Sequence, residues 1–170
     1  IRDVAVTGVQ TCALPICHIE QLGDPETVYE HPSTAFVAGF IGRNNFWTGV
    51  ATEHGAKADD GTVFVASRPE EDVPNGEQAL SAVRPEGIHL SADQPDRVEN
   101  NCRGTVAGVS HFWDVLQYVV TSGDRDLLVL TPRLDTRRFA LGEDVWCSWS
   151  ADDVYLFSAR QADVVLAEDQ

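Results

Sequence analysis

The pattern of apolar and polar positions divides the chain into a short helical part and a longer part built of strands. Asp24, followed by Pro25 and Glu26, is typical of a helix start. An aspartate caps free backbone amides, a proline fits the first helical position, and an early acid suits the positive end of the helix dipole. We therefore predict a first short helix that runs to about Glu30.

A second predicted helix begins at Pro32 and ends at Gly42, since glycine is favoured just past a helix end. Its large apolar residues fall at i, i+1, i+4 and i+5, which places them on one side of the helix. These residues are Phe36, Val37, Phe40 and Ile41. An apolar face of this kind needs something to pack against, so we predict that it is a docking face.

After Gly42, short apolar stretches alternate with clusters of glycine, proline, asparagine and aspartate, which is typical of strands joined by turns. The predicted strands cover residues 46–52, 62–66, 78–83, 88–90, 103–109, 115–121, 126–130, 144–149 and 154–157. Hairpin turns are predicted at 59–61, 74–76 and 122–124, where glycine or asparagine adopts a positive φ at little cost. The fold class is therefore mainly β, a small antiparallel barrel or sandwich preceded by a short helical segment.

Charge and apolar run length exclude two classes of partner. The formal net charge is −15, and binding to nucleic acid is driven by clustered lysines and arginines that this chain lacks. No apolar run approaches the roughly 20 residues that a membrane-spanning helix requires. We predict no nucleic-acid partner and no direct insertion into a membrane.

Residues that carry catalytic or metal chemistry do not form a recognisable pattern. The five histidines are scattered, and Cys102 and Cys147 are far apart in sequence and show no metal-ligand spacing, so they are expected to be reduced core residues. No phosphate-binding loop and no nucleophile-elbow motif is present. We therefore assign no catalytic residue, no cofactor-binding residue and no metal ligand in this chain.

The four tryptophans leave two interpretations open. They are core residues, or they form an aromatic cage for a cation. Trp146 and Trp149 lie an odd number of residues apart on one predicted strand, so at most one of them points into the barrel.

Three segments carry a resemblance to a known family. Residues 19–42 (IEQLGDPETVYEHPSTAFVAGFIG) resemble the stretch that closes the nucleotide-binding domain of one group of ABC-importer ATPases. Residues 82–88 (AVRPEGI) resemble the Val-Arg-Pro-Glu signature of the transport-associated OB-like, or TOBE, domain of these ATPases. The block 104–120 and the turn 141–145 look like its later hairpin and Gly-x-Asp-Val turn, although His111-Phe112-Trp113-Asp114 departs from the family pattern.

This resemblance implies a domain organisation: residues 18–44 are the helical end of a nucleotide-binding domain and residues 45–170 are the OB-like TOBE domain. It also implies a parent protein that binds ATP and Mg and hydrolyses ATP to import a small solute, of which the spermidine and putrescine type is most similar. The implied partners are a second ATPase copy and the membrane-spanning permease subunits. The implied location is the cytoplasmic face of the inner membrane, with this region serving accessory, regulatory and dimerisation roles.

Residues 2–17 (RDVAVTGVQTCALPIC) resemble the translated read-through of a sequencing-library adapter. We interpret residues 1–17 as a non-native tail, which is left out of fold reasoning. The chain would then be a truncated C-terminal part that cannot itself hydrolyse ATP. The alternative is a stand-alone OB-like cytosolic module that binds a small molecule and begins near His18.

Arg84 and Glu86 flank a proline that stiffens the backbone between them. Two charges on a rigid turn suit a contact between the OB-like domain and the ATPase domain. The alternative is a local surface ion pair, which contributes less than about 1 kcal/mol.

Overall fold

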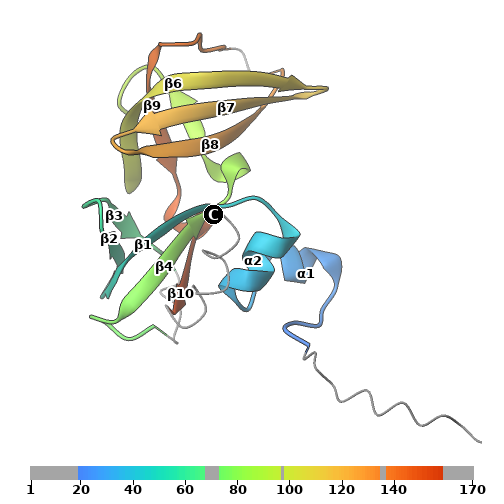
Figure 1. Ribbon diagram of the computed structural model, residues 1–170, viewed down its shortest axis with the longest axis vertical. Helices are drawn as coiled ribbons and strands as arrows, with labels where there is room; N and C mark the ends of the chain where they lie inside the picture. Colours follow the sequence, from blue (N-terminus) through green and yellow to red (C-terminus); the bar gives the residue numbers. More distant parts are fainter. Residues whose placement is uncertain (1–18, 68–72, 97, 135–136, 159–170) are drawn as a thin grey trace, which may run out of the picture.

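The computed structural model describes residues 19–67, 73–96, 98–134 and 137–158. The predicted tail at residues 1–17 lies outside this part. Two short helices precede two five-stranded antiparallel sheets, stacked end to end along the long axis of the molecule (Figure 1). Among the described residues, no helix is long and apolar enough to cross a membrane.

Both helices begin with a side-chain cap, and the first begins where the sequence predicts. Helix α1 spans Pro25–Glu30, and the Asp24 carboxylate accepts a hydrogen bond from the Thr27 amide at 2.9 Å. Helix α2 spans Ala35–Ile41 and starts later than predicted, because Thr34 and not Pro32 supplies the cap, through a hydrogen bond from the Val37 amide at 3.2 Å.

The first sheet has the strand order β10-β4-β1-β2-β3 and the second has the order β5-β9-β6-β7-β8. The strands of the first sheet are β1 Asn45–Thr52, β2 Gly55–Ala58, β3 Val63–Val65, β4 Gln78–Val83 and β10 Val154–Ser158. Those of the second sheet are β5 His89–Ser91, β6 Asn100–Phe112, β7 Val115–Ser122, β8 Arg125–Pro132 and β9 Asp144–Trp149. The mainly β fold predicted from the sequence is confirmed.

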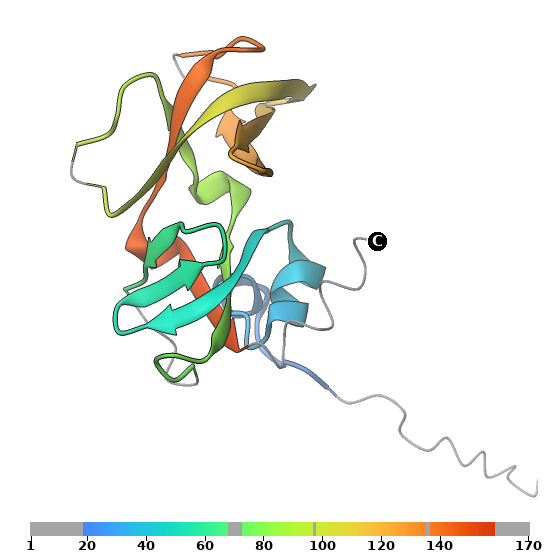
Figure 2. The ribbon, with the colours of Figure 1, turned by 60° about the vertical axis from the view of Figure 1, so that its left-hand side comes forward.

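The chain crosses between the sheets twice. It leaves β4 through the 3-10 turn η1, Pro85–Gly87, and enters β5 in the second sheet. It returns from β9 through η2, Ala151–Asp153, and enters β10, which pairs with β4. Figure 2 shows these two crossings between the sheets, with the helices beside the first sheet. The first sheet therefore contains strands from both ends of the described chain, and the second sheet is formed by the chain between them.

The structure adds a strand and corrects a turn. Strand β2 was not predicted because Gly55–Ala58 has only small side chains and one lysine, so it carries little alternation signal. The turns at residues 59–61 and 122–124 connect paired strands, as predicted. The hairpin predicted at residues 74–76 is wrong: this turn leads into β4, whose neighbours are β1 and β10, and the Gly76 amide donates to the Ala51 carbonyl of β1 at 2.9 Å.

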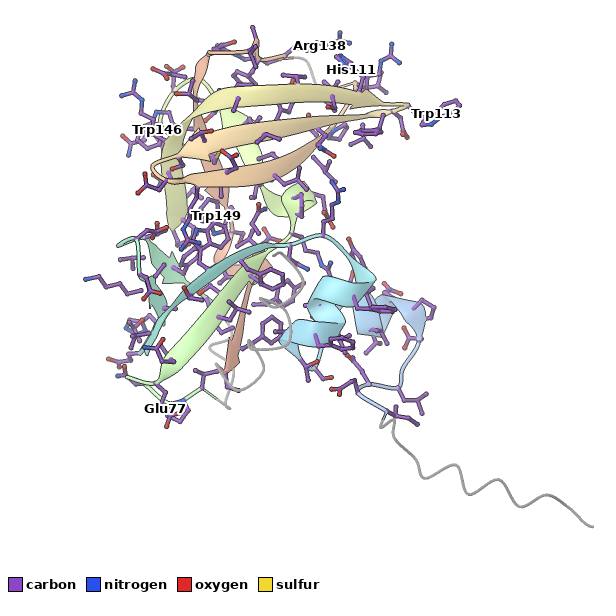
Figure 3. The ribbon with its side chains drawn as sticks, viewed as in Figure 1. Glu77, His111, Trp113, Arg138, Trp146 and Trp149 are labelled. Carbon is purple, nitrogen blue, oxygen red and sulfur yellow. The ribbon has the colours of Figure 1, made fainter. Side chains whose placement is uncertain are left out.

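An aromatic cluster fills the junction of the two sheets. Trp47 of β1 and Trp149 of β9 are buried, and their ring centroids are 6.0 Å apart. Phe64 of β3 packs against both, at 4.9 Å from Trp47 and 5.8 Å from Trp149. Trp149 lies at this junction in Figure 3, whereas Trp146 is half-buried on the other face of β9. The parity prediction for these two tryptophans is therefore confirmed.

Two buried asparagine side chains bond the sheets to each other. Asn45 of β1 accepts a hydrogen bond from the Leu128 amide of β8 at 2.7 Å and donates to the Leu128 carbonyl at 2.9 Å. Asn100 of β6 accepts from the Val65 amide of β3 at 2.8 Å and donates to its carbonyl at 2.9 Å. Each amide thus pairs with one residue of the opposite sheet as a neighbouring strand would.

Replacement of Trp149 by alanine is expected to lower the free energy of unfolding by about 3–5 kcal/mol, because it leaves a cavity between Trp47 and Phe64. Urea denaturation measures the change. The matched control is Trp113→Ala, since Trp113 is 93% exposed and its loss is expected to cost less than about 0.5 kcal/mol. Equal costs for the two variants would contradict the central position of Trp149.

Candidate contact surfaces

Helix α2 packs on the first sheet through small residues. Ala35 and Ala38 lie in a buried cluster with residues of β4 and β10, namely Leu80, Ala82 and Phe157. Alanine lets the helix backbone approach the sheet closely. The predictions did not include these two alanines, because an amphipathic pattern is dominated by large side chains.

The four residues of the predicted docking face do not share one environment. Val37 is buried and Phe36 is half-buried, while Phe40 and Ile41 are 76% and 43% exposed. The rings of Phe36 and Phe40 stack at a centroid distance of 5.9 Å. The outer part of this face, Phe40 and Ile41, is apolar surface with no cover among the described residues, and its docking role stays a prediction.

Arg84, which lies between strand β4 and the turn η1, connects the first sheet to helix α1. Its guanidinium is buried and lies over the Tyr29 ring, 3.7 Å from the centroid, with the Tyr155 ring of β10 at 5.8 Å. One terminal nitrogen, Nη2, donates to the backbone carbonyl of Tyr29. Its Nε and Nη1 atoms have no hydrogen-bond partner among the described residues. The two tyrosine rings therefore supply much of the environment that compensates this buried cation.

Glu86, which follows Pro85 in the sequence, contacts the same tyrosine. Its carboxylate accepts a hydrogen bond from the Tyr29 hydroxyl. Burial, and then this hydrogen bond and the negative charge of Glu86, raise the pKa of Tyr29 above its ordinary value of 10.0. Arg84 and Glu86 thus hold one residue of α1, and we call Arg84, Glu86 and Tyr29 the tyrosine latch.

The tyrosine latch bears on the sequence prediction for Arg84 and Glu86. The two side chains do not pair with each other as a surface ion pair, and each contacts the helical segment instead. Whether that segment belongs to an ATPase domain is a separate question, so the interdomain role stays a prediction.

A second exposed apolar region lies at the far end of the second sheet. Strands β6 and β7 form a long hairpin whose turn places Trp113 at a positive φ of 49° and leaves it 93% exposed, at the tip in Figure 3. Arg133, just after β8, supports this turn, with its amide bonded to the Asp114 carbonyl at 2.6 Å. A shallow cavity of about 370 Å³ lies nearby, lined by residues that include His111, Leu116, Arg138 and Leu141.

The remaining candidate residues are dispersed over the fold. No group of three or more potential metal ligands occurs within the described residues. Trp47 and Trp149 are core residues, and the four tryptophans do not converge on one cage. The labelled positions of Trp113, Trp146 and Trp149 in Figure 3 illustrate this separation. The described chain thus presents exposed apolar surfaces at α2 and at the β6–β7 hairpin.

The architecture and the signature residues agree with comparisons to known proteins. The fold resembles a crystal structure of the cytoplasmic molybdate-binding protein ModG with molybdate bound, with a TM-score of 0.58 over 67% of this chain and 95% of the other. The identity to that protein is 13%, so the likeness concerns the fold. Residues 81–157 match the TOBE domain family.

Relatives with high sequence similarity carry the same region. The chain is 37% identical over 148 residues to the spermidine/putrescine import ATP-binding protein PotA of Thermobifida fusca, covering 81% of this chain and 38% of that protein. It is 34% identical over 158 residues to PotA of Acidothermus cellulolyticus, covering 86% of this chain and 40% of that protein. The chain therefore contains a TOBE domain and is homologous to the C-terminal region of these ABC-importer ATPases.

Replacement of Arg84 by alanine is expected to release α1 from the barrel, because it removes the buried cation between Tyr29 and Tyr155. The expected cost is about 2 kcal/mol, the value of a desolvated cation–π contact. The measurements are urea denaturation and hydrogen exchange of the α1 amides. The control is Arg103→Ala, whose exposed pair with Asp144, at 2.9 Å, contributes less than about 1 kcal/mol. Unchanged exchange in α1 of the Arg84 variant would contradict the latch.

Proposed function

We propose that this chain is the C-terminal accessory region of the ATP-binding subunit of an ABC importer. In this proposal residues 18–44 close the nucleotide-binding domain and residues 45–170 form the TOBE domain. Homology supports it, since the match to the Thermobifida relative covers 81% of this chain, more than residues 81–170 amount to. The similarity therefore extends from the TOBE match back into the earlier residues.

The relatives are longer than this chain, which spans about two fifths of the length of the first two. The rest of such a protein would hold the ATP and Mg site and perform the hydrolysis. The partners in this proposal are a second ATPase copy and the permease subunits, which would hold the protein at the cytoplasmic face of the membrane. The names of the relatives favour spermidine or putrescine as the imported solute.

The exposed apolar side of α2 is the observation in the fold that favours this function over a stand-alone binding module. Phe40 and Ile41 are exposed on a helix whose inner side already packs against the first sheet. A stand-alone module has no need of such an exposed apolar surface. If α2 closes an ATPase domain, that domain would cover Phe40 and Ile41.

The proposal is tested at the source locus by reading the codons upstream of His18 in the same frame. We expect a phosphate-binding loop, an LSGGQ-like signature and a Walker B aspartate. A start codon close to His18 would overturn the proposal and favour the stand-alone module. Uptake of labelled spermidine by cells that carry the complete gene and lack other polyamine importers then tests the solute, with unlabelled putrescine and a sugar as competitors.

The isolated chain is expected to associate as its concentration rises, because Phe40 and Ile41 are uncovered. Light scattering across a concentration series measures the association. The double variant Phe40→Ser, Ile41→Ser is expected to reduce it, while Trp113→Ser, at the opposite end, is expected to leave it unchanged. A monomer at every concentration, or loss of association only in the Trp113 variant, would contradict a docking role for α2.

A further inference from the structure

Two cysteines that are far apart in sequence face each other in the second sheet. Cys102 of β6 and Cys147 of β9 are partners in the antiparallel register. Residues directly opposite in such a pair have Cα atoms about 4.5–5.5 Å apart and side chains on the same face. A disulfide requires Cα atoms about 4.4–6.8 Å apart, so the backbone already meets this condition. Both thiols are free in the structure.

The two thiols differ in environment. Cys147 is fully buried among core residues, whereas Cys102 is half-buried. Cys102 also lines a small cavity of about 20 Å³ together with Ser122, Arg125 and Trp149. A space of this size holds about one water molecule. The buried Trp149 Nε1 has no partner among the described residues, so one polar group is available near this space.

The contacts of the pair favour a thiolate on Cys102. Hydrogen bonding from the Cys147 thiol lowers the pKa of Cys102 to about 7. The same bond to Cys102 and burial raise the pKa of Cys147. The hydroxyl of Ser122 donates to the Arg103 carbonyl at 2.9 Å. The charged groups of the cavity are Asp60 and Arg125, which pair with each other at 2.8 Å. A thiolate is the form that reacts with oxidants.

We propose that Cys102 and Cys147 form an oxidation site for small peroxides, in which Cys102 reacts first and Cys147 then closes a cross-strand disulfide. In the first step the Cys102 thiolate attacks a peroxide oxygen, the O–O bond breaks, and Cys102 becomes a sulfenic acid while hydroxide leaves. In the second step the Cys147 sulfur attacks the sulfenic sulfur. Its proton leaves with the hydroxyl group as water.

The disulfide would link the neighbouring strands β6 and β9 and enclose β7 and β8 in a covalent loop. Such a link restricts the unfolded chain and is expected to raise the denaturation midpoint. The inference concerns the TOBE domain alone and does not depend on the proposed transport function.

The test treats the full chain with a small excess of hydrogen peroxide, blocks remaining thiols, and analyses tryptic peptides without reduction. We expect a linked pair of the Cys102 and Cys147 peptides, lighter by two hydrogens than their sum, and a higher urea midpoint that dithiothreitol reverses. Absence of this linked pair, or linkage of Cys102 to Cys12 or Cys17 instead, would overturn the proposal.

Two variants separate the roles of the cysteines. Cys147→Ser is expected to leave a Cys102 sulfenic acid that dimedone labels, because the thiol opposite Cys102 on β9 that would resolve it is removed. Cys102→Ser, at the more accessible position, is expected to leave Cys147 reduced at the same peroxide dose. Oxidation of Cys147 in the Cys102→Ser variant would show that Cys147 reacts with peroxide without Cys102. This result would overturn the proposed order of reaction.

Discussion

The pairing of two buried asparagines with backbone groups of the opposite sheet is the interaction on which this fold depends. Asn45 bonds to both polar groups of Leu128, and Asn100 bonds to both polar groups of Val65. A buried amide without partners costs about 1–3 kcal/mol, so each pairing is favoured in this one arrangement of the sheets. The aromatic cluster of Trp47, Phe64 and Trp149 packs in the space that the pairings define.

The position of the helical segment follows from that arrangement. Strand β10 comes from the far end of the described chain and pairs with β4. These two strands form the surface on which Ala35 and Ala38 pack. Tyr155 of β10 also contributes the second ring near Arg84. The tyrosine latch and the Tyr155 ring near it therefore bring together residues from three separate parts of the chain.

Two groups of exposed apolar residues in the described chain have different physical causes. The residues around α2 are exposed because one side of the helix packs on the first sheet and no described residue covers the other side. The second group, at the distal end, includes Phe112, Trp113, Leu134 and Leu141, on a hairpin tip and the loops beside it. In the proposed function an ATPase domain would cover the first group, whereas the second group lies on the TOBE domain itself.

The sequence by itself determined most of the strands, the presence of both helices and the family resemblance, because alternation, caps and short motifs are local signals. It did not reveal β2, whose small residues carry no periodicity. It also did not reveal that β4 pairs with β1 and β10, and that no hairpin forms at residues 74–76. Only the tertiary structure brought Tyr29 to Arg84 and Cys102 to Cys147, since strand register and the two crossings between sheets set these contacts. Such contacts join residues distant in sequence, and their geometry depends on the packing of the whole core.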